Sequence, residues 1–244
     1  MIKKINGLNI NYVDYGNEKG KTIVLLHGWG QNIEMMKPLT TMLQKEFRII
    51  ILDLPGFGES DIPQKIYTIY NYVEIVKELL DELKVENPIM IGHSFGGKIT
   101  LAYASKYNCE KIVLLASPFK KEIKKLSLKV KILKKLKKVP VLNKFEEFAK
   151  KHIGSTDYRN ANPIMRKILV EHVNLDLTED VKNIKCPTLI IWGTLDEEVP
   201  VERANELEDL IKDSGTVILD GGTHYAYLEF LPKVKSILNV FLKD

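Results

Sequence analysis

Cysteine, tryptophan and long apolar runs are all scarce in this sequence. The two cysteines, Cys109 and Cys186, are too few for a secreted disulfide framework, and they lack the spacing of metal ligands. We therefore expect two buried thiols in a reducing compartment. No apolar run approaches the ~18 residues of a membrane span, and no apolar stretch of a signal peptide follows residues 1–7. These absences favour a cytoplasmic protein.

The remaining composition is that of an ordinary globular protein. The chain has 244 residues, of which 45% are hydrophobic and 28% are charged. Such proportions argue against disorder and against a coiled coil. The length fits one large α/β domain, or a domain with one insertion.

Short apolar runs alternate with amphipathic segments along most of the chain. Continuous apolar strands of this kind predict a mostly parallel sheet covered by helices on both faces. We also expect an antiparallel hairpin around Asn6 and Gly7. The expected strands are 22–26, 48–53, 88–91, 112–116, 188–192 and 216–219, and the expected helices are 35–45, 72–83, 96–107, 201–211 and 232–241.

One stretch interrupts the alternation and divides the chain. We expect residues 1–117 and 184–244 to form the α/β core and residues 118–183 to form a helical insertion. Residues 120–151 hold thirteen lysines against three glutamates, a local balance of +10 in a chain whose net charge is +4. A basic segment is therefore inserted into a mildly acidic body.

A glycine-rich turn joins an expected strand to an expected helix at residues 92–97. The pattern Gly92-x-Ser94-x-Gly96 in that context is the nucleophile elbow. A chain that passes so abruptly from strand to helix strains the serine and brings the two elements close together, so Gly92 and Gly96 must lack side chains. The turn would raise the Ser94 hydroxyl above the edge of the sheet.

The partners that a nucleophilic serine requires follow in order. A histidine must take the hydroxyl proton, and a carboxylate must orient that histidine. Asp196 and His224 follow the expected strands 188–192 and 216–219, on loops at the carboxyl edge of the sheet, where such folds place their ligands. We therefore assign Ser94, Asp196 and His224 as the catalytic residues.

With these motifs the chain resembles serine hydrolases of the α/β-hydrolase fold. The resemblance also rests on residues 27–30 (His-Gly-Trp-Gly), 53–60 and 192–200. It implies an oxyanion hole made by the backbone N–H groups of Trp29 and Phe95, which would also be substrate-binding residues. It further implies hydrolysis of a small-molecule carboxylic ester through an acyl-enzyme, with no metal and no organic cofactor.

Other assignments of the base and the acid are weaker. Neighbouring residues at a strand end point apart, so His93 is not expected to serve Ser94. We expect His27 to shape its loop, and we expect His152 and His172 to be solvated or structural. Glu197, Glu198 and Asp220 compete with Asp196, while the resemblance implies a structural role for Asp53.

The insertion corresponds to the lid of this fold and leaves several functions open. Leu126, Val130 and Leu133 would face the pocket and the lysines would face water. The lysines could instead hold an anionic carrier protein, as in the methyl-ester esterases of biotin synthesis that the chain more loosely resembles, or an anionic membrane surface. A carbon–carbon bond hydrolase is disfavoured because these relatives usually carry methionine at the position of Phe95. A non-catalytic ligand-binding protein remains a further alternative, whereas nucleic-acid binding is not expected.

Overall fold

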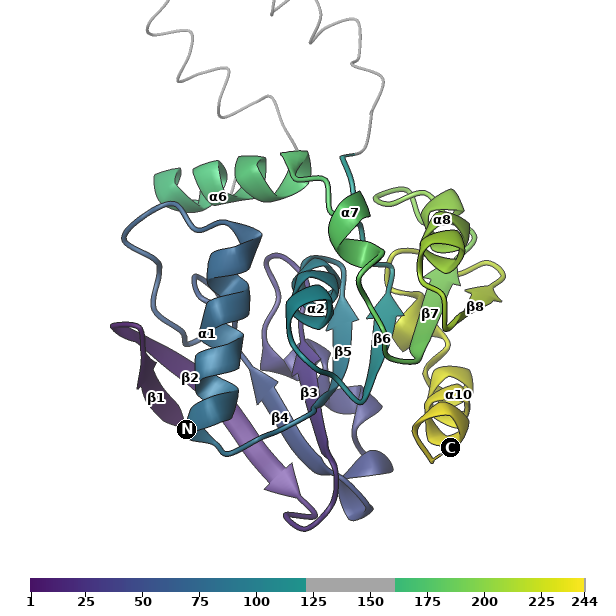
Figure 1. Cartoon of the computed structure of the whole chain (residues 1–244), viewed down its shortest axis with the longest axis horizontal. Helices are drawn as coiled ribbons and strands as arrows, with labels where there is room; N and C mark the ends of the chain where they lie inside the picture. Colours follow the sequence, from purple (N-terminus) through teal and green to yellow (C-terminus); the bar gives the residue numbers. More distant parts are fainter. Residues whose placement is uncertain (122–160, 244) are drawn as a thin grey trace, which may run out of the picture.

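The computed structural model describes residues 1–121 and 161–243 and contains an eight-stranded sheet (Figure 1). The spatial order is β1-β2-β4-β3-β5-β6-β7-β8. The β1–β2 and β2–β4 pairs are antiparallel, and all other neighbours are parallel. The strands are β1 (Ile2–Ile5), β2 (Leu8–Gly16), β3 (Thr22–Leu26), β4 (Arg48–Leu52), β5 (Ile89–His93), β6 (Lys111–Leu115), β7 (Thr188–Gly193) and β8 (Ser214–Leu219).

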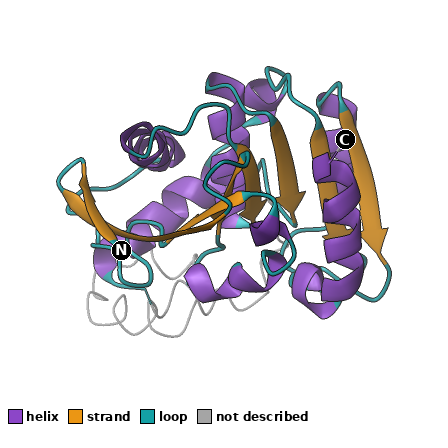
Figure 2. Ribbon diagram, turned by 90° about the horizontal axis from the view of Figure 1, so that it is seen from below, coloured by secondary structure: helices purple, strands orange, loops and turns teal. Residues whose placement is uncertain are grey.

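Helices cover both faces of this sheet (Figure 2). Successive side chains of the central strands point to opposite faces. Val24 and Leu26 accordingly join one apolar cluster, with residues of α1 and α2, while Ile23 and Leu25 join another, with residues of α10. The helices are α1 (Ile69–Glu82), α2 (Phe95–Lys106), α6 (Pro163–Asn174), α7 (Thr178–Val181), α8 (Glu202–Leu210), α9 (Ala226–Glu229) and α10 (Leu231–Lys243).

The expected mostly parallel α/β-hydrolase architecture is thereby confirmed, including the hairpin around Asn6 and Gly7. The β1–β2 turn pairs Ile5 with Leu8, and both Asn6 and Gly7 have positive φ. Among the described residues, no helix combines the length and apolar character that a bilayer crossing requires.

The helix expected over residues 35–45 was wrong. This segment instead forms short 3-10 turns, η1 (Ile33–Met35), η2 (Lys37–Leu39) and η3 (Leu43–Lys45). Pro38 lacks the N–H that a continuous helix would use. The hydroxyls of Thr40 and Thr41 donate to the carbonyls of Lys37 and Pro38, which competes with regular helical bonding.

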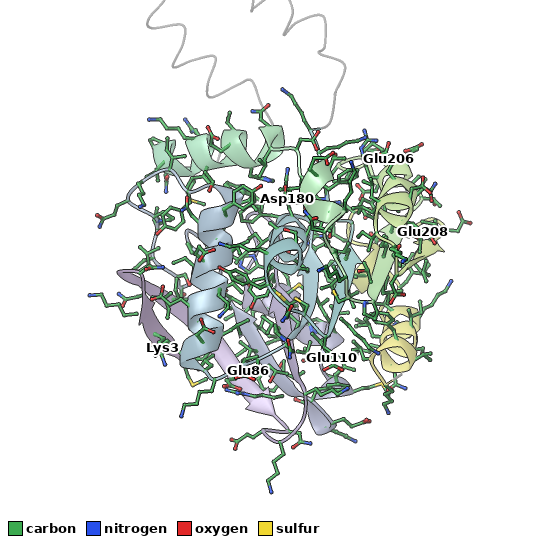
Figure 3. The ribbon with its side chains drawn as sticks, viewed as in Figure 1. Lys3, Glu86, Glu110, Asp180, Glu206 and Glu208 are labelled. Atoms are coloured by element: carbon green, nitrogen blue, oxygen red, sulfur yellow. The ribbon has the colours of Figure 1, made fainter. Side chains whose placement is uncertain are left out.

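Both ends of the expected insertion are anchored to the core. α6 lies at the end of the sheet towards which β5 and β6 point (Figure 1). Lys120 pairs with Glu206 of α8 at 2.8 Å, and the hydroxyl of Tyr70 in α1 donates to Asp180 of α7 at 3.2 Å; Figure 3 labels both acidic side chains. Residues 122–160 lie outside the described residues, and with them the predicted pocket-facing side chains and most of the lysines.

Candidate active site

Ser94 occupies the turn between β5 and α2. Since β5 lies between β3 and β6, the turn leaves the middle of the sheet. The backbone of Ser94 has φ 50° and ψ −110°, a conformation that residues other than glycine rarely adopt. Its N–H donates to the carbonyl of Leu115 in β6 at 2.9 Å. This strain is what the elbow pattern predicted, because it is the geometry that lifts the hydroxyl off the sheet.

The glycines of the elbow are sterically required. A Cβ on Gly92 would lie 2.5 Å from the carbonyl oxygen of Gly96, and one on Gly96 would lie 2.3 Å from the carbonyl oxygen of Leu26. A Cβ on Gly97 would lie 1.7 Å from Oγ of Ser117. The close packing of α2 against the ends of β3 and β5 and against Ser117, which follows β6, therefore explains all three positions.

Asp196 and His224 come together at the carboxyl edge of the sheet. The Nδ1–H of His224 donates to Oδ2 of Asp196 at 2.8 Å. The other carboxylate oxygen, Oδ1, accepts from the N–H groups of Glu198 at 2.9 Å and Val199 at 2.8 Å. The Asp196 side chain is fully buried and the His224 side chain is 11% exposed. The pair leaves Nε2 of His224 as the nitrogen available to a reacting proton.

His93, the residue before Ser94, connects the elbow to this pair. Its Nε2 lies 3.0 Å from the carbonyl oxygen of His224, which can only accept, so Nε2 carries the proton. Burial lowers the pKa of His93 to about 3, so the ring is neutral at physiological pH. Its proton is committed to the His224 backbone, which agrees with the expectation that His93 is not the base.

The loop of Trp29 lies beside the start of α2. Phe95 is the first helical residue, so its N–H has no acceptor within the helix. In the described part of the chain, neither this N–H nor that of Trp29 donates a hydrogen bond. Both donors are thus available at the elbow. The neighbouring N–H of Gly96, in contrast, already donates to the carbonyl of His27 at 3.1 Å.

His27 shapes the Trp29 loop, as expected. Its Nδ1–H donates to the carbonyl of Gly28 at 2.7 Å, and its Nε2 accepts from the N–H of Leu54 at 3.0 Å. Burial lowers its pKa to about 4. The neutral ring therefore joins the Trp29 loop to the segment after β4 through hydrogen bonds.

The competing acids have other environments. Asp53 accepts from the N–H of Ile33 and from Asn11 and Glu59, which fits its expected structural role. Glu197, Glu198 and Asp220 are exposed, whereas Asp196 is buried. Among the described acids considered for the role, Asp196 is the one bonded to His224.

Sequence reasoning did not anticipate where His172 lies. It projects from α6, is 7% exposed, and stacks on Trp29 with ring centroids 5.5 Å apart and planes 16° apart. It also meets the Phe95 ring at 4.7 Å. Helical periodicity places His172 on the same face as Ile168 and Leu169, and that apolar face was the available signal.

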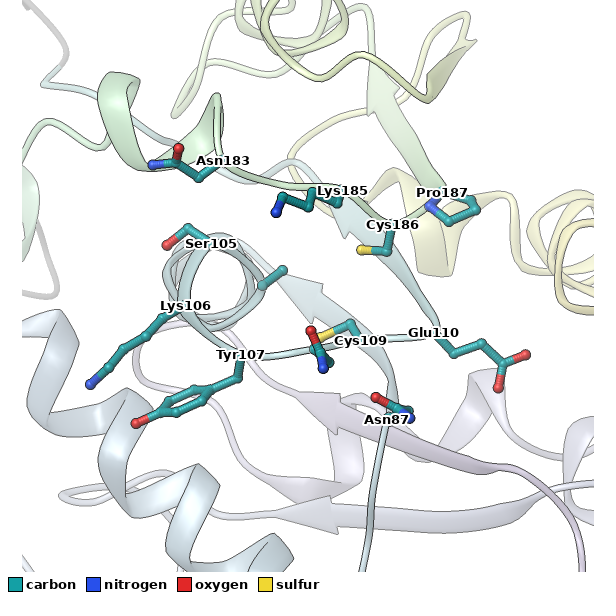
Figure 4. A pocket seen from close by; sticks show the side chains of 12 residues that line it. Asn87, Ser105, Lys106, Tyr107, Cys109, Glu110, Asn183, Lys185, Cys186 and Pro187 are labelled. Atoms are coloured by element: carbon teal, nitrogen blue, oxygen red, sulfur yellow. The ribbon is translucent and has the colours of Figure 1, made fainter.

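Neither a metal-ligand cluster nor the cavity beside the two cysteines contributes to this site in the described residues. No group of three potential ligands within residues 1–121 and 161–243 could hold a metal ion. A cavity of about 430 Å³ lies at the opposite, amino edge of the sheet and is lined by residues that include Cys109 and Cys186 (Figure 4). Both thiols are free, and burial raises the pKa of Cys186 to about 11 and that of Cys109 further, so neither is a ready nucleophile.

Comparison with known proteins agrees with this architecture. Residues 21–134 match the family described as alpha/beta hydrolase fold. The chain is 27% identical to the AB hydrolase superfamily protein YisY of Bacillus subtilis, over 91% of each chain. It is 29% identical to a pimeloyl-[acyl-carrier protein] methyl ester esterase of Pseudoalteromonas atlantica, over 86% of this chain and 89% of the relative.

Solved structures give the same result. A bromoperoxidase from Bacillus anthracis superposes with a TM-score of 0.80 at 25% identity, covering 100% of this chain and 99% of the other. An esterase from Exiguobacterium antarcticum superposes with a TM-score of 0.78 at 22% identity, with the same coverage. The chain has the α/β-hydrolase fold. It is a hydrolytic enzyme of the esterase-like kind within that fold.

Proposed function

We propose that the protein is a serine esterase that cleaves a small-molecule carboxylic ester through an acyl-enzyme. The observation that carries the proposal is the buried Asp196–His224 pair, 2.8 Å apart, at the sheet edge where the strained elbow presents Ser94. A histidine oriented in this way is what a serine hydroxyl needs to become nucleophilic near neutral pH.

In the proposed reaction, Nε2 of His224 accepts the Ser94 proton while Oγ attacks the ester carbonyl. The N–H groups of Trp29 and Phe95 stabilise the resulting oxyanion. The intermediate collapses to the acyl-enzyme, and His224 returns the proton to the departing alcohol. Water, deprotonated by His224, then attacks the acyl-enzyme and releases the acid and the free Ser94 hydroxyl. Asp196 stabilises the imidazolium at both stages.

A second candidate is an esterase that acts on an ester carried by acyl carrier protein. It is supported by the Pseudoalteromonas relative and by the thirteen lysines of residues 120–151, which would suit an acidic carrier. The pimeloyl group in the name of this relative is longer than an acetyl or butyryl group. The choice between the two candidates therefore rests on the acyl group that the site admits.

The test is replacement of the nucleophile. We expect Ser94→Ala to lose hydrolysis of p-nitrophenyl acetate by at least about a thousandfold while keeping its thermal unfolding curve. A fluorophosphonate probe should label the wild type at Ser94 and leave the variant unlabelled. Ser105→Ala, on the same helix, is the matched control and should keep both activity and labelling. Wild-type turnover by Ser94→Ala would disprove the mechanism, and an unlabelled wild type would favour a non-catalytic binding protein.

A further inference from the structure

A stack of rings lies beside the elbow. His172 of α6 lies flat on Trp29 and edge-on to Phe95, and Trp29 meets Phe57 at a centroid distance of 4.8 Å. His172 and Phe95 are buried, at 7% and 0% exposed, and Trp29 is half-buried. The two residues whose N–H groups would hold the oxyanion therefore also carry rings in contact with α6.

The end of α6 that bears His172 is bonded to a buried lysine of α2. Lys98 of α2 is 1% exposed, and its Nζ donates to the carbonyl of His172 at 2.7 Å and to that of Leu175 at 2.6 Å. Carbonyls at the end of a helix lack partners within the helix and carry partial negative charge, so they suit a buried ammonium group. At the other end, Asn162 caps α6 by accepting from the N–H groups of Ile164 and Met165. The imidazole of His172 is therefore held by both its stack and its backbone.

His172 acts as an uncharged ring. Burial and, to a smaller extent, the charge of Lys98 lower its pKa to about 3. The ring is therefore neutral near neutral pH and does not act as an acid, and what the structure shows of it at the site is its ring contacts with Trp29 and Phe95.

The position of the stack relative to the reaction follows from the proposed function, on which this inference rests. The leaving alcohol must lie against His224, which protonates it. His224 packs against His93, with ring centroids 4.9 Å apart, whereas Trp29 and His172 pack on Phe95, the residue on the other side of Ser94. A carbonyl carbon attacked by Ser94 with its oxygen at the N–H groups of Trp29 and Phe95 would lie beside the stack, and we infer that its acyl substituent extends along the stacked rings.

We propose that His172, stacked on Trp29, is a specificity-determining residue that restricts the enzyme to esters of short-chain acids, from acetyl to butyryl. A longer chain meets two packed rings that Lys98 and the α6 backbone prevent from separating. This restriction disfavours a carrier-bound long acyl chain as the substrate.

The test compares kcat/KM for p-nitrophenyl acetate, butyrate, hexanoate and octanoate. We expect wild type to favour acetate and butyrate. Because each methylene admitted to an apolar pocket is worth about tenfold or more, His172→Ala should raise the hexanoate-to-acetate ratio by about tenfold. His172→Phe keeps a flat ring and should keep the wild-type ratio. Val173→Ala is the matched control, since Val173 is 43% exposed on the same helix, and it should leave the ratio unchanged.

Trp29→Leu removes the other ring while keeping the backbone N–H, and it should shift the ratio in the same direction. If thermal unfolding shows that His172→Ala does not fold, Trp29→Leu tests the proposed restriction in its place. The proposal is overturned if wild type hydrolyses octanoate as well as acetate, or if folded His172→Ala and Trp29→Leu leave the hexanoate-to-acetate ratio unchanged. Such a result with an inactive Ser94→Ala would overturn the restriction alone, whereas an active Ser94→Ala would overturn the proposed function.

Discussion

Replacing Asp196 by asparagine separates the orientation of His224 from the stability of its loop. In the native site, Oδ1 accepts from the N–H groups of Glu198 and Val199, and Oδ2 accepts from Nδ1–H of His224. The asparagine carbonyl oxygen keeps its place opposite the two backbone donors. Its NH₂ group must then face Nδ1 of His224.

Two donors cannot share one hydrogen bond, so the imidazole responds by changing tautomer. The proton moves to Nε2, and the nitrogen that should accept the Ser94 proton is blocked. We expect kcat to fall by about 10⁴-fold, the size of loss associated with a wrong histidine tautomer. This loss corresponds to about 5.4 kcal/mol of barrier. Because the two backbone hydrogen bonds remain, the free energy of unfolding should change by only about 1 kcal/mol.

The assay pairs the initial rate of p-nitrophenyl acetate hydrolysis with urea unfolding of the same preparations. Asp220→Asn is the control, because Asp220 is an exposed acid that follows β8 and accepts from the hydroxyl of Thr194 at 3.2 Å. It should retain wild-type kcat. Near-native activity in Asp196→Asn, or an equal loss in Asp220→Asn, would refute the assignment of Asp196 as the orienting carboxylate.

Two further predictions concern stability. Gly96→Ala places a Cβ 2.3 Å from the carbonyl oxygen of Leu26 and should lower the free energy of unfolding by about 3 kcal/mol. In the control Gly215→Ala, the new Cβ meets nothing within 4 Å, so the free energy of unfolding should change by less than about 1 kcal/mol. Equal urea midpoints for the two variants would contradict the steric account. Each histidine that binds a proton only when unfolded makes unfolding easier as pH falls from about 6.5 towards its folded-state pKa, which is about 3 for His172, by about 1.4 kcal/mol per pH unit. His172→Phe should therefore reduce the slope of unfolding free energy against pH by about that amount, and an unchanged slope would show that His172 is protonated in the folded protein. The buried histidines with lowered pKa are His27, His93 and His172.

Local patterns alone predicted much of the fold. Continuous apolar runs bounded by glycine, proline or polar residues identified the strands, because a strand buried on both faces tolerates only apolar side chains. The exception was the helix expected over residues 35–45. The apolar residues there suggested a helix, but Pro38 and the back-bonding hydroxyls of Thr40 and Thr41 act on the backbone rather than on hydrophobic periodicity.

Short-range patterns predicted the elbow, the chain order of Ser94, Asp196 and His224, and the edge of the sheet at which we expected them to lie. These follow from short-range rules: glycine where a Cβ would clash, and loops at the carboxyl ends of parallel strands. The packing of whole elements was needed to show that Asp196 is the carboxylate bonded to His224, that His93 bonds the His224 carbonyl, and that His172 of α6 stacks on Trp29. Those contacts join residues 28, 131 and 143 positions apart, and such distant pairings depend on how whole elements pack, which no local pattern encodes.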